Sequence, residues 1–186
     1  MLPFILAQIF GLLGSIAMLL SNWQKTRNKV LTLLILDSIC YFIQYILLGA
    51  LSGAFTNVIG LIRTIIFKYK DKYKVLDNKI ILFIILLIYL IVGIITYDGI
   101  ISTLPVIAAI IYTSVLWQDN LKIIRIGTFI MILACFIYNI AVEAYTGAVV
   151  EGILLISSVL AIIKLDILNE HHRKKSNIIL KKLTNH

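Results

Sequence analysis

The sequence predicts an all-α membrane protein, with seven transmembrane helices arranged as two parallel three-helix repeats around one further helix. The composition is the first indication. Of 186 residues, 61% are hydrophobic and only 14% charged, and the mean hydropathy is +1.02. A soluble domain carries about 25% charged residues, so this chain cannot cover its surface with polar groups in water. Much of that surface must therefore face lipid.

The length of the apolar segments is the second indication. A membrane-spanning helix needs about 20 mostly apolar residues, and seven segments approach that length. Residues 80–117 would form one helix of about 57 Å at 1.5 Å per residue, so we place a break at the turn signal Asp98-Gly99. The predicted spans are residues 2–20, 30–49, 53–69, 80–97, 100–117, 126–142 and 147–163.

The basic residues indicate the orientation. Lysine and arginine follow the first, third, fifth and seventh spans, whereas the connections near Ala50, Asp98 and Glu143 contain neither. Basic loops face the cytoplasm, so the N-terminus is expected outside and the C-terminus inside. The N-terminal segment lacks a basic start, so we expect a retained helix and not a signal peptide. Trp23 and Trp117 are expected as anchors at the cytoplasmic interface.

An internal repeat is the third indication. The dipeptide Trp-Gln occurs at residues 23–24 and again 94 positions later, at residues 117–118. The same shift pairs Gly53-Ala54 with Gly147-Ala148, and Lys70 with Lys164. Two tandem three-helix units would face opposite ways, and one extra span between them makes them parallel. The expected division is a first repeat (1–70), a linker with the fourth helix (71–98), a second repeat (99–165) and a basic cytoplasmic tail (166–186).

Short motifs, in their order and spacing, resemble the YgjV-type family of bacterial inner-membrane proteins over roughly residues 4–165. These motifs are Leu6-Ala7-Gln8, Leu48-Gly49, Ile62-Arg63-Thr64, Leu104-Pro105-Val106-Ile107 and Glu151-Gly152. The resemblance implies a multi-pass protein of the cytoplasmic membrane. The helix plan more distantly resembles the SWEET and PQ-loop transporters, although both halves lack the Pro-Gln dipeptide. That likeness implies a carrier or facilitator of a small polar solute, sugar- or vitamin-like. The alternative is a non-transporting membrane receptor or interaction protein.

Charged side chains within spans cost about 2.5–3.5 kcal/mol to insert and are therefore candidate functional residues. Asp37 and Arg63 lie at similar depths on antiparallel neighbouring spans, so they can meet. They form a structural ion pair, or they make a cytoplasmic-side gate or solute contact, or both side chains reach the interface separately.

Polar residues on the spans are the candidate solute ligands. In SWEET-like proteins the third helix of each half lines the pocket, and that resemblance makes Asn57 and Glu151 the leading pair. The shift of 94 places one opposite the other. The alternative for Glu151 is a position at the lipid headgroups. Other polar groups either line the same cavity or bond neighbouring helices, and these are Gln44, Tyr45, Tyr138 and Asn139.

The sequence favours no catalytic, metal or cofactor site. It contains no phosphate-binding loop, zinc-protease motif or nucleophile elbow, so we expect no enzyme. Cys40 and Cys135 lie in apolar runs and are expected as buried hydrophobic residues. His171-His172 lies in the basic tail without acidic or Cys partners at ligand spacing, so we expect a solvated tail and not a metal site. The net charge of +8 fits cytoplasmic loops better than nucleic-acid binding. The expected partners are the lipid bilayer, a small polar solute and, as an open alternative, a second copy of the chain.

Overall fold

The computed structural model describes residues 2–48, 51–95, 97, 99–141 and 145–168. Every regular element in these ranges is helical, which confirms the all-α prediction. The elements are α1 (Leu2–Asn22), α2 (Arg27–Leu47), α3 (Leu51–Tyr69), α4 (Lys79–Ile95), a short 3₁₀ turn (Ile100–Ser102), α5 (Thr103–Leu116), α6 (Leu121–Ala141), α7 (Tyr145–Ile162) and a π-helical extension, η2 (Ile163–Leu168).

Four segments in the described part of the chain are long and apolar enough to cross a membrane. They are Leu2–Asn22, Arg27–Leu47, Leu121–Tyr138 and Ala148–Leu168. Two shorter apolar helices cover Lys79–Ile95 and Ile100–Leu116. The break predicted between them lies at Gly99, whose φ of 89° is a conformation that favours glycine. The chain is therefore a multi-pass membrane protein by length and composition.

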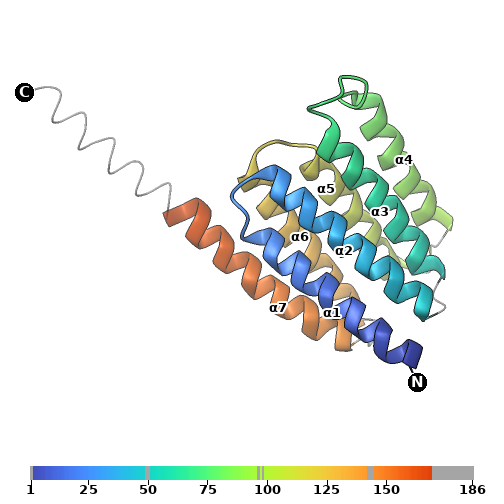
Figure 1. Ribbon diagram of the computed structural model, residues 1–186. Helices are drawn as coiled ribbons and strands as arrows, with labels where there is room; N and C mark the ends of the chain where they lie inside the picture. The colour runs from blue at the N-terminus through green and yellow to red at the C-terminus, as the bar shows by residue number, and fades with distance from the viewer. Residues whose placement is uncertain (1, 49–50, 96, 98, 142–144, 169–186) are drawn as a thin grey trace, which may run out of the picture.

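Six of the helices form a closed ring. Helix α1 packs against α2 and α7, α2 against α3, α3 against α5, α5 against α6, and α6 against α7. Helix α4 packs on α5 and stands outside this ring. Figure 1 shows α7 beside α1, although the two lie far apart in the sequence. The N-terminal and C-terminal helices therefore close the ring between them.

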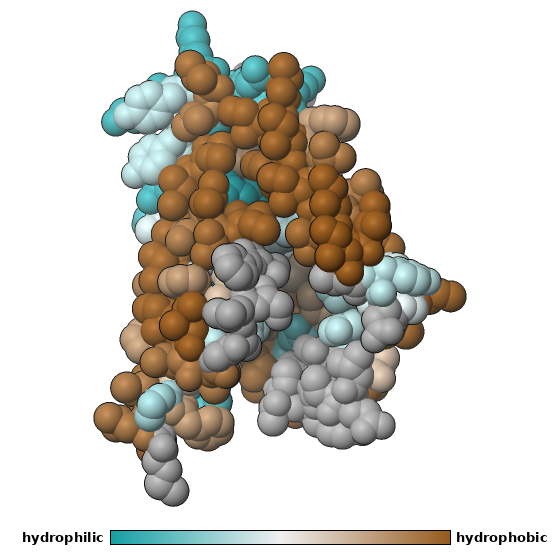
Figure 2. Space-filling view, turned by 90° about the vertical axis from the view of Figure 1, so that its right-hand side faces the viewer, coloured by the Kyte–Doolittle hydropathy of each residue, from teal (hydrophilic) through white to brown (hydrophobic). Residues whose placement is uncertain are grey.

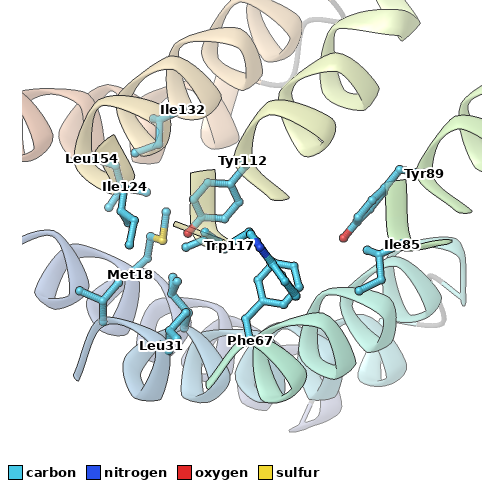
Figure 3. Close-up of a cluster of buried hydrophobic side chains, with 13 residues drawn as sticks. Met18, Leu31, Phe67, Ile85, Tyr89, Tyr112, Trp117, Ile124, Ile132 and Leu154 are labelled. Carbon is cyan, nitrogen blue, oxygen red and sulfur yellow. The ribbon is translucent and has the colours of Figure 1, made fainter. Parts of the chain in front are cut away.

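A cluster of buried apolar side chains joins the helices of the bundle (Figure 3). Phe67 of α3 and Trp117, at the end of α5, meet edge to face with ring centroids 5.0 Å apart. Trp117 is only 9% exposed, so it packs inside the bundle, whereas an interface anchor would face lipid. The expectation for Trp117 was wrong because this tryptophan fills the junction of α3 and α5.

The outward-facing side chains are mostly large and apolar. Phe83 and Ile94 of α4 are 67% and 69% exposed, which in water would be unfavourable. Figure 2 shows one side of the molecule, where hydrophobic residues cover most of the surface and hydrophilic ones gather at the upper end. This distribution suits a bundle surrounded by lipid.

Candidate functional site

A cavity of about 900 Å³ opens between α1, α2, α3, α6 and α7. Its volume lies within the range of small-molecule sites, about 300–1,000 Å³. Its polar lining comes from four of these helices and comprises Gln8, Ser15, Asp37, Tyr41, Gln44, Tyr45, Asn57 and Glu151. Apolar side chains such as Ile132 and Leu154 supply the rest of the wall.

Helix α2 contributes a polar and aromatic stripe to the cavity. Asp37, Tyr41, Gln44 and Tyr45 stand at positions i, i+4, i+7 and i+8, which share one face of a helix. The rings of Tyr41 and Tyr45 are stacked, with centroids 6.3 Å apart and planes 27° apart. The aspartate therefore lies one turn before a pair of tyrosine rings on the same cavity wall.

Small residues of α1 hold this stripe in place. A Cβ atom on Gly14 would come within 3.0 Å of the Tyr41 ring, and one on Gly11 would overlap the side-chain amide of Gln44. Ser15 Oγ bonds the Tyr41 hydroxyl at 2.8 Å and also donates to the Gly11 carbonyl at 3.0 Å. The two helices thus approach closely, and the approach fixes the direction of Tyr41 and Gln44.

Asp37 is the most unusual residue of the lining. Its Oδ1 atom is buried and has no hydrogen-bond partner among the described residues. A buried carboxylate oxygen without a donor is unfavourable, and in native proteins such an atom needs a specific explanation. The oxygen belongs to a residue that lines the cavity, so a ligand in the cavity could supply the donor.

Arg63 is buried on α3 but does not line the cavity. Its Nη1 group donates to the Tyr89 hydroxyl at 3.3 Å and to the Thr113 hydroxyl at 3.1 Å. The guanidinium carbon lies 5.2 Å from the centroid of the Tyr112 ring. Arg63 therefore joins α3 to α4 and α5. It acts on Asp37 electrostatically, yet the ion pairs of the described residues do not include the two together.

The structure brings four of the polar residues predicted from the sequence, Asn57, Glu151, Gln44 and Tyr45, into the lining of one cavity. Tyr138 is half-buried on α6 and is not among the lining residues, and the side chain of Asn139 lies outside the described residues. The sequence reading missed three lining residues: Gln8, Ser15 and Tyr41. Tyr41 could have been found, because it stands one helical turn from both Asp37 and Tyr45.

A second set of interactions lies at one end of the bundle. The α1–α2, α3–α4 and α5–α6 connections meet η2 there, and we call this end the basic end. Arg27 donates from Nε to the Gln118 carbonyl at 2.9 Å and from Nη2 to the Leu116 carbonyl at 3.1 Å. It also pairs with Asp71 at 3.3 Å. The last carbonyls of α5 would otherwise lack helical partners, so Arg27 stabilises the end of that helix.

Arg125 stabilises the end of α1 in the same way. Its Nε donates to the Asn22 carbonyl at 3.3 Å, its Nη2 donates to the Gln24 carbonyl at 2.6 Å, and its Nη1 pairs with Asp166. The sequence reading placed Arg125 in a loop, but α6 begins at Leu121 and buries this arginine to 6% exposure. We call these two sets of contacts the Arg27 clamp and the Arg125 clamp.

The carbonyl groups that the two clamps bind are related by the shift of 94, whereas Arg27 and Arg125 themselves are 98 positions apart. The carbonyls of residues 22 and 24 accept from Arg125, and those of residues 116 and 118 accept from Arg27. Two lysine–tryptophan contacts show the same shift of 94. Lys70 lies 4.8 Å from the ring centroid of Trp117, and Lys164 lies 5.7 Å from that of Trp23. Arg27 and Lys70 thus contact the end of α5, and Arg125 and Lys164 contact the end of α1.

An all-helical bundle with a lipid-facing surface and a polar internal cavity defines a multi-pass membrane protein with an interior site. The family comparison agrees with this class. The model of the Imp-YgjV family, described as bacterial inner membrane protein, matches residues 5–168. The chain belongs to that family, as the sequence motifs predicted. No curated protein and no solved structure matches the chain.

Proposed function

We propose that the protein carries or facilitates a small polar solute across the bacterial cytoplasmic membrane, without chemical change to the solute. The cavity is the observation that supports this proposal. The wall offers eight polar side chains to a bound solute in a bundle that otherwise faces lipid, and polar residues within membrane spans are candidates for a role in solute binding. Its volume would hold a solute of sugar or vitamin size.

The proposal includes seven spans, with the N-terminus outside. The basic end gathers Arg27, Lys70, Arg125 and Lys164, and such an end favours the cytoplasmic face. Helix α4, with 17 residues, would span about 26 Å at 1.5 Å per residue. That length is near the lower limit for a transmembrane helix.

The proposal also includes two like-oriented repeats, α1–α3 and α5–α7, with α4 as the linker. The ring of six helices supports it, because the contact of α1 with α7 corresponds to the contact of α5 with α3. The acceptor carbonyls of the Arg27 and Arg125 clamps support it, because they are 94 positions apart, and so do the Lys70–Trp117 and Lys164–Trp23 contacts. Parallel repeats of this kind pack about an axis along the membrane normal and leave a site between them.

Alternating access would then require the halves to separate at the basic end. Both clamps join the first half to the second, so they close the cytoplasmic side while they are formed. Release of a solute into the cytoplasm would break them. This gives the clamps a role in the transport cycle beyond the stabilisation of two helix ends.

A two-stage experiment tests the function. The purified protein is first screened by thermal unfolding against sugars, nucleosides, vitamins, amino acids and organic cations, because a bound ligand stabilises the fold by mass action. A ligand found in this way is then followed into proteoliposomes by counterflow. We expect uptake above that of protein-free vesicles. Ligand binding without uptake would refute transport and favour the receptor alternative.

A further inference from the structure

We infer that the cavity binds an uncharged planar heterocycle that carries an N–H group, as nucleobases do. This solute class rests on the proposed function, because the same cavity would carry the solute. The observations come from one face of α2, which presents to the cavity an oxygen of Asp37, the rings of Tyr41 and Tyr45, and the amide of Gln44.

Asp37 presents a hydrogen-bond acceptor that needs a donor. Its Oδ1 atom is buried, and no described residue donates a hydrogen bond to it. A buried acceptor without a donor is unfavourable, and an N–H group of a ligand in the cavity would supply one. The positive charge of Arg63 already acts on Asp37 from behind the cavity wall, so a neutral donor is sufficient.

Tyr41 has no hydrogen to offer a ligand. Ser15 carries a single hydroxyl hydrogen, which it donates to the Gly11 carbonyl at 3.0 Å. The hydrogen of the 2.8 Å bond between the Ser15 and Tyr41 hydroxyls therefore comes from Tyr41. The oxygen of Tyr41 can then only accept. With Asp37 it makes this part of the wall an acceptor surface, which favours a ligand that donates.

Two aromatic rings favour a planar ligand. Tyr41 and Tyr45 both line the cavity, with ring centroids 6.3 Å apart and planes 27° apart. One edge of the Tyr41 ring packs so closely on α1 that a Cβ atom on Gly14 would come within 3.0 Å of it, so this ring is fixed before a ligand arrives. Planar bases stack well on aromatic side chains, whereas a saturated sugar ring has no π-system to stack.

The Gln44 amide complements a second edge of such a ring. It lines the cavity and packs against α1 at Gly11, where a Cβ atom would overlap it. A carboxamide has one acceptor oxygen and two donor hydrogens, so it can pair with the adjacent N–H and C=O groups of a lactam. Residues 37 and 44 are about 10 Å apart along the helix axis, and a heterocycle over Tyr41 would lie between them.

The test compares rings that carry an N–H group with their N-methylated counterparts. Uracil is paired with 1,3-dimethyluracil, and theophylline with caffeine, because methylation removes the donor and leaves the planar ring. Binding to the purified protein is measured by calorimetry at a pH where all four compounds are uncharged. We expect at least one parent compound to bind at least fivefold more tightly than its methylated counterpart. A smaller ratio in both pairs, or no binding of either parent compound, would overturn the inference.

Variants of Asp37 locate the acceptor. Asp37→Leu keeps a similar side-chain shape but removes both oxygens, so the parent and methylated compounds should then bind within twofold of each other. Asp37→Asn keeps one acceptor oxygen and should retain the preference for the parent compound. Asp77→Leu is the matched control, because Asp77 is exposed on the α3–α4 connection. An undiminished preference in Asp37→Leu would exclude this site.

Variants of Tyr41 separate its ring from its hydroxyl, and they keep the test valid if Asp37→Leu does not fold. Tyr41→Phe retains the ring and should weaken binding of the parent compound no more than twofold. Tyr41→Leu removes the ring and should weaken that binding at least fivefold. Equal losses in the two variants would show that the ring does not hold the ligand, and would overturn the inference.

The outcomes separate the two proposals. A sugar that binds and is taken up, while neither uracil nor theophylline binds, would overturn the heterocycle inference and leave the carrier function standing. A heterocycle that binds through Asp37 without counterflow would support the heterocycle site and refute transport.

Discussion

Lys70 meets Trp117 across the basic end, with its ammonium 4.8 Å from the indole centroid and its Nζ atom donating to the Trp117 carbonyl at 2.8 Å. The lysine is 6% exposed, so both interactions form largely away from water. A desolvated cation–π contact contributes about 2 kcal/mol, and a hydrogen bond from a charged group about 1.5–3 kcal/mol. This single side chain thus connects α3 of the first half to the end of α5 in the second.

Replacing Lys70 should therefore lower stability. We expect Lys70→Gln to reduce the free energy of unfolding by about 1–2 kcal/mol, measured by thermal or denaturant unfolding in detergent. Lys72→Gln is the control, because the Lys72 ammonium lies over the neighbouring Tyr73 ring on the exposed α3–α4 connection. Equal effects of the two substitutions would show that the contact with Trp117 contributes nothing.

The clamps should depend on the shape of arginine and not only on its charge. Arg125→Lys keeps the positive charge but removes the planar set of donors that reaches two carbonyls and Asp166. We expect a loss of about 1–3 kcal/mol in unfolding free energy. The reverse change at an exposed position of the same helix, Lys122→Arg, should have little effect. An Arg125→Lys protein as stable as the wild type would show that charge alone suffices.

The close approach of α1 and α2 predicts a size limit at Gly11. Alanine usually stabilises a helix by up to about 1 kcal/mol relative to glycine, but a methyl group at Gly11 would overlap the Gln44 amide. Gly11→Ala should therefore displace Gln44 and weaken ligand binding. Gly152→Ala is the matched control, since its Cβ would meet Phe136 at an ordinary 3.6 Å. Calorimetry with the ligand found by screening would measure both, and equal affinities would contradict the prediction.

The partners of Arg63 can be separated by double-mutant cycles. The structure places this arginine against Tyr89 and Thr113, so Arg63→Gln should show a coupling energy of about 0.5–3 kcal/mol with Tyr89→Phe. The coupling with Asp37→Asn should be smaller. A larger coupling to Asp37 than to Tyr89 would restore the ion pair expected from the sequence.

The topology can be tested with single cysteines in a background lacking Cys40 and Cys135. Cysteines at Ser52 and Asp98 should react with an impermeant thiol reagent added to intact cells, because these positions lie at the connections without basic residues. A cysteine at Asp71, which contacts Arg27 at the basic end, should react only after the membrane is opened. Labelling of position 71 in intact cells would reverse the orientation.

The helices were predictable because lipid imposes a length on apolar segments, and each predicted span coincides with a helix of the structure to within a few residues. The detailed placement of side chains could not be predicted from the sequence. Equal depth suggested that Asp37 meets Arg63, but depth fixes only the position along a helix axis. The direction around the axis depends on packing, and here Arg63 faces α4 and α5 while Asp37 faces the cavity.

The lining of the cavity was predictable only in part. Asn57 and Glu151 were predicted from the resemblance to SWEET-like proteins and from the shift of 94, and both line the cavity. Ser15 carries a small side chain that also suits ordinary helix packing, so its hydrogen bond with Tyr41 in the folded bundle is what reveals it. Arg125 was misplaced because a charge near the start of a helix cannot be told from a charge in the preceding loop.

The exchange of contacts between the two halves has a kinetic consequence. Each clamp joins the two halves, so under the proposed transport cycle a rigid rotation of one half against the other stretches both clamps at once. Opening at the basic end is then expected to be cooperative, with few molecules that have one clamp broken and the other intact. Weakening either arginine should raise the opening rate of the whole end, and the two halves should move as a single two-state unit.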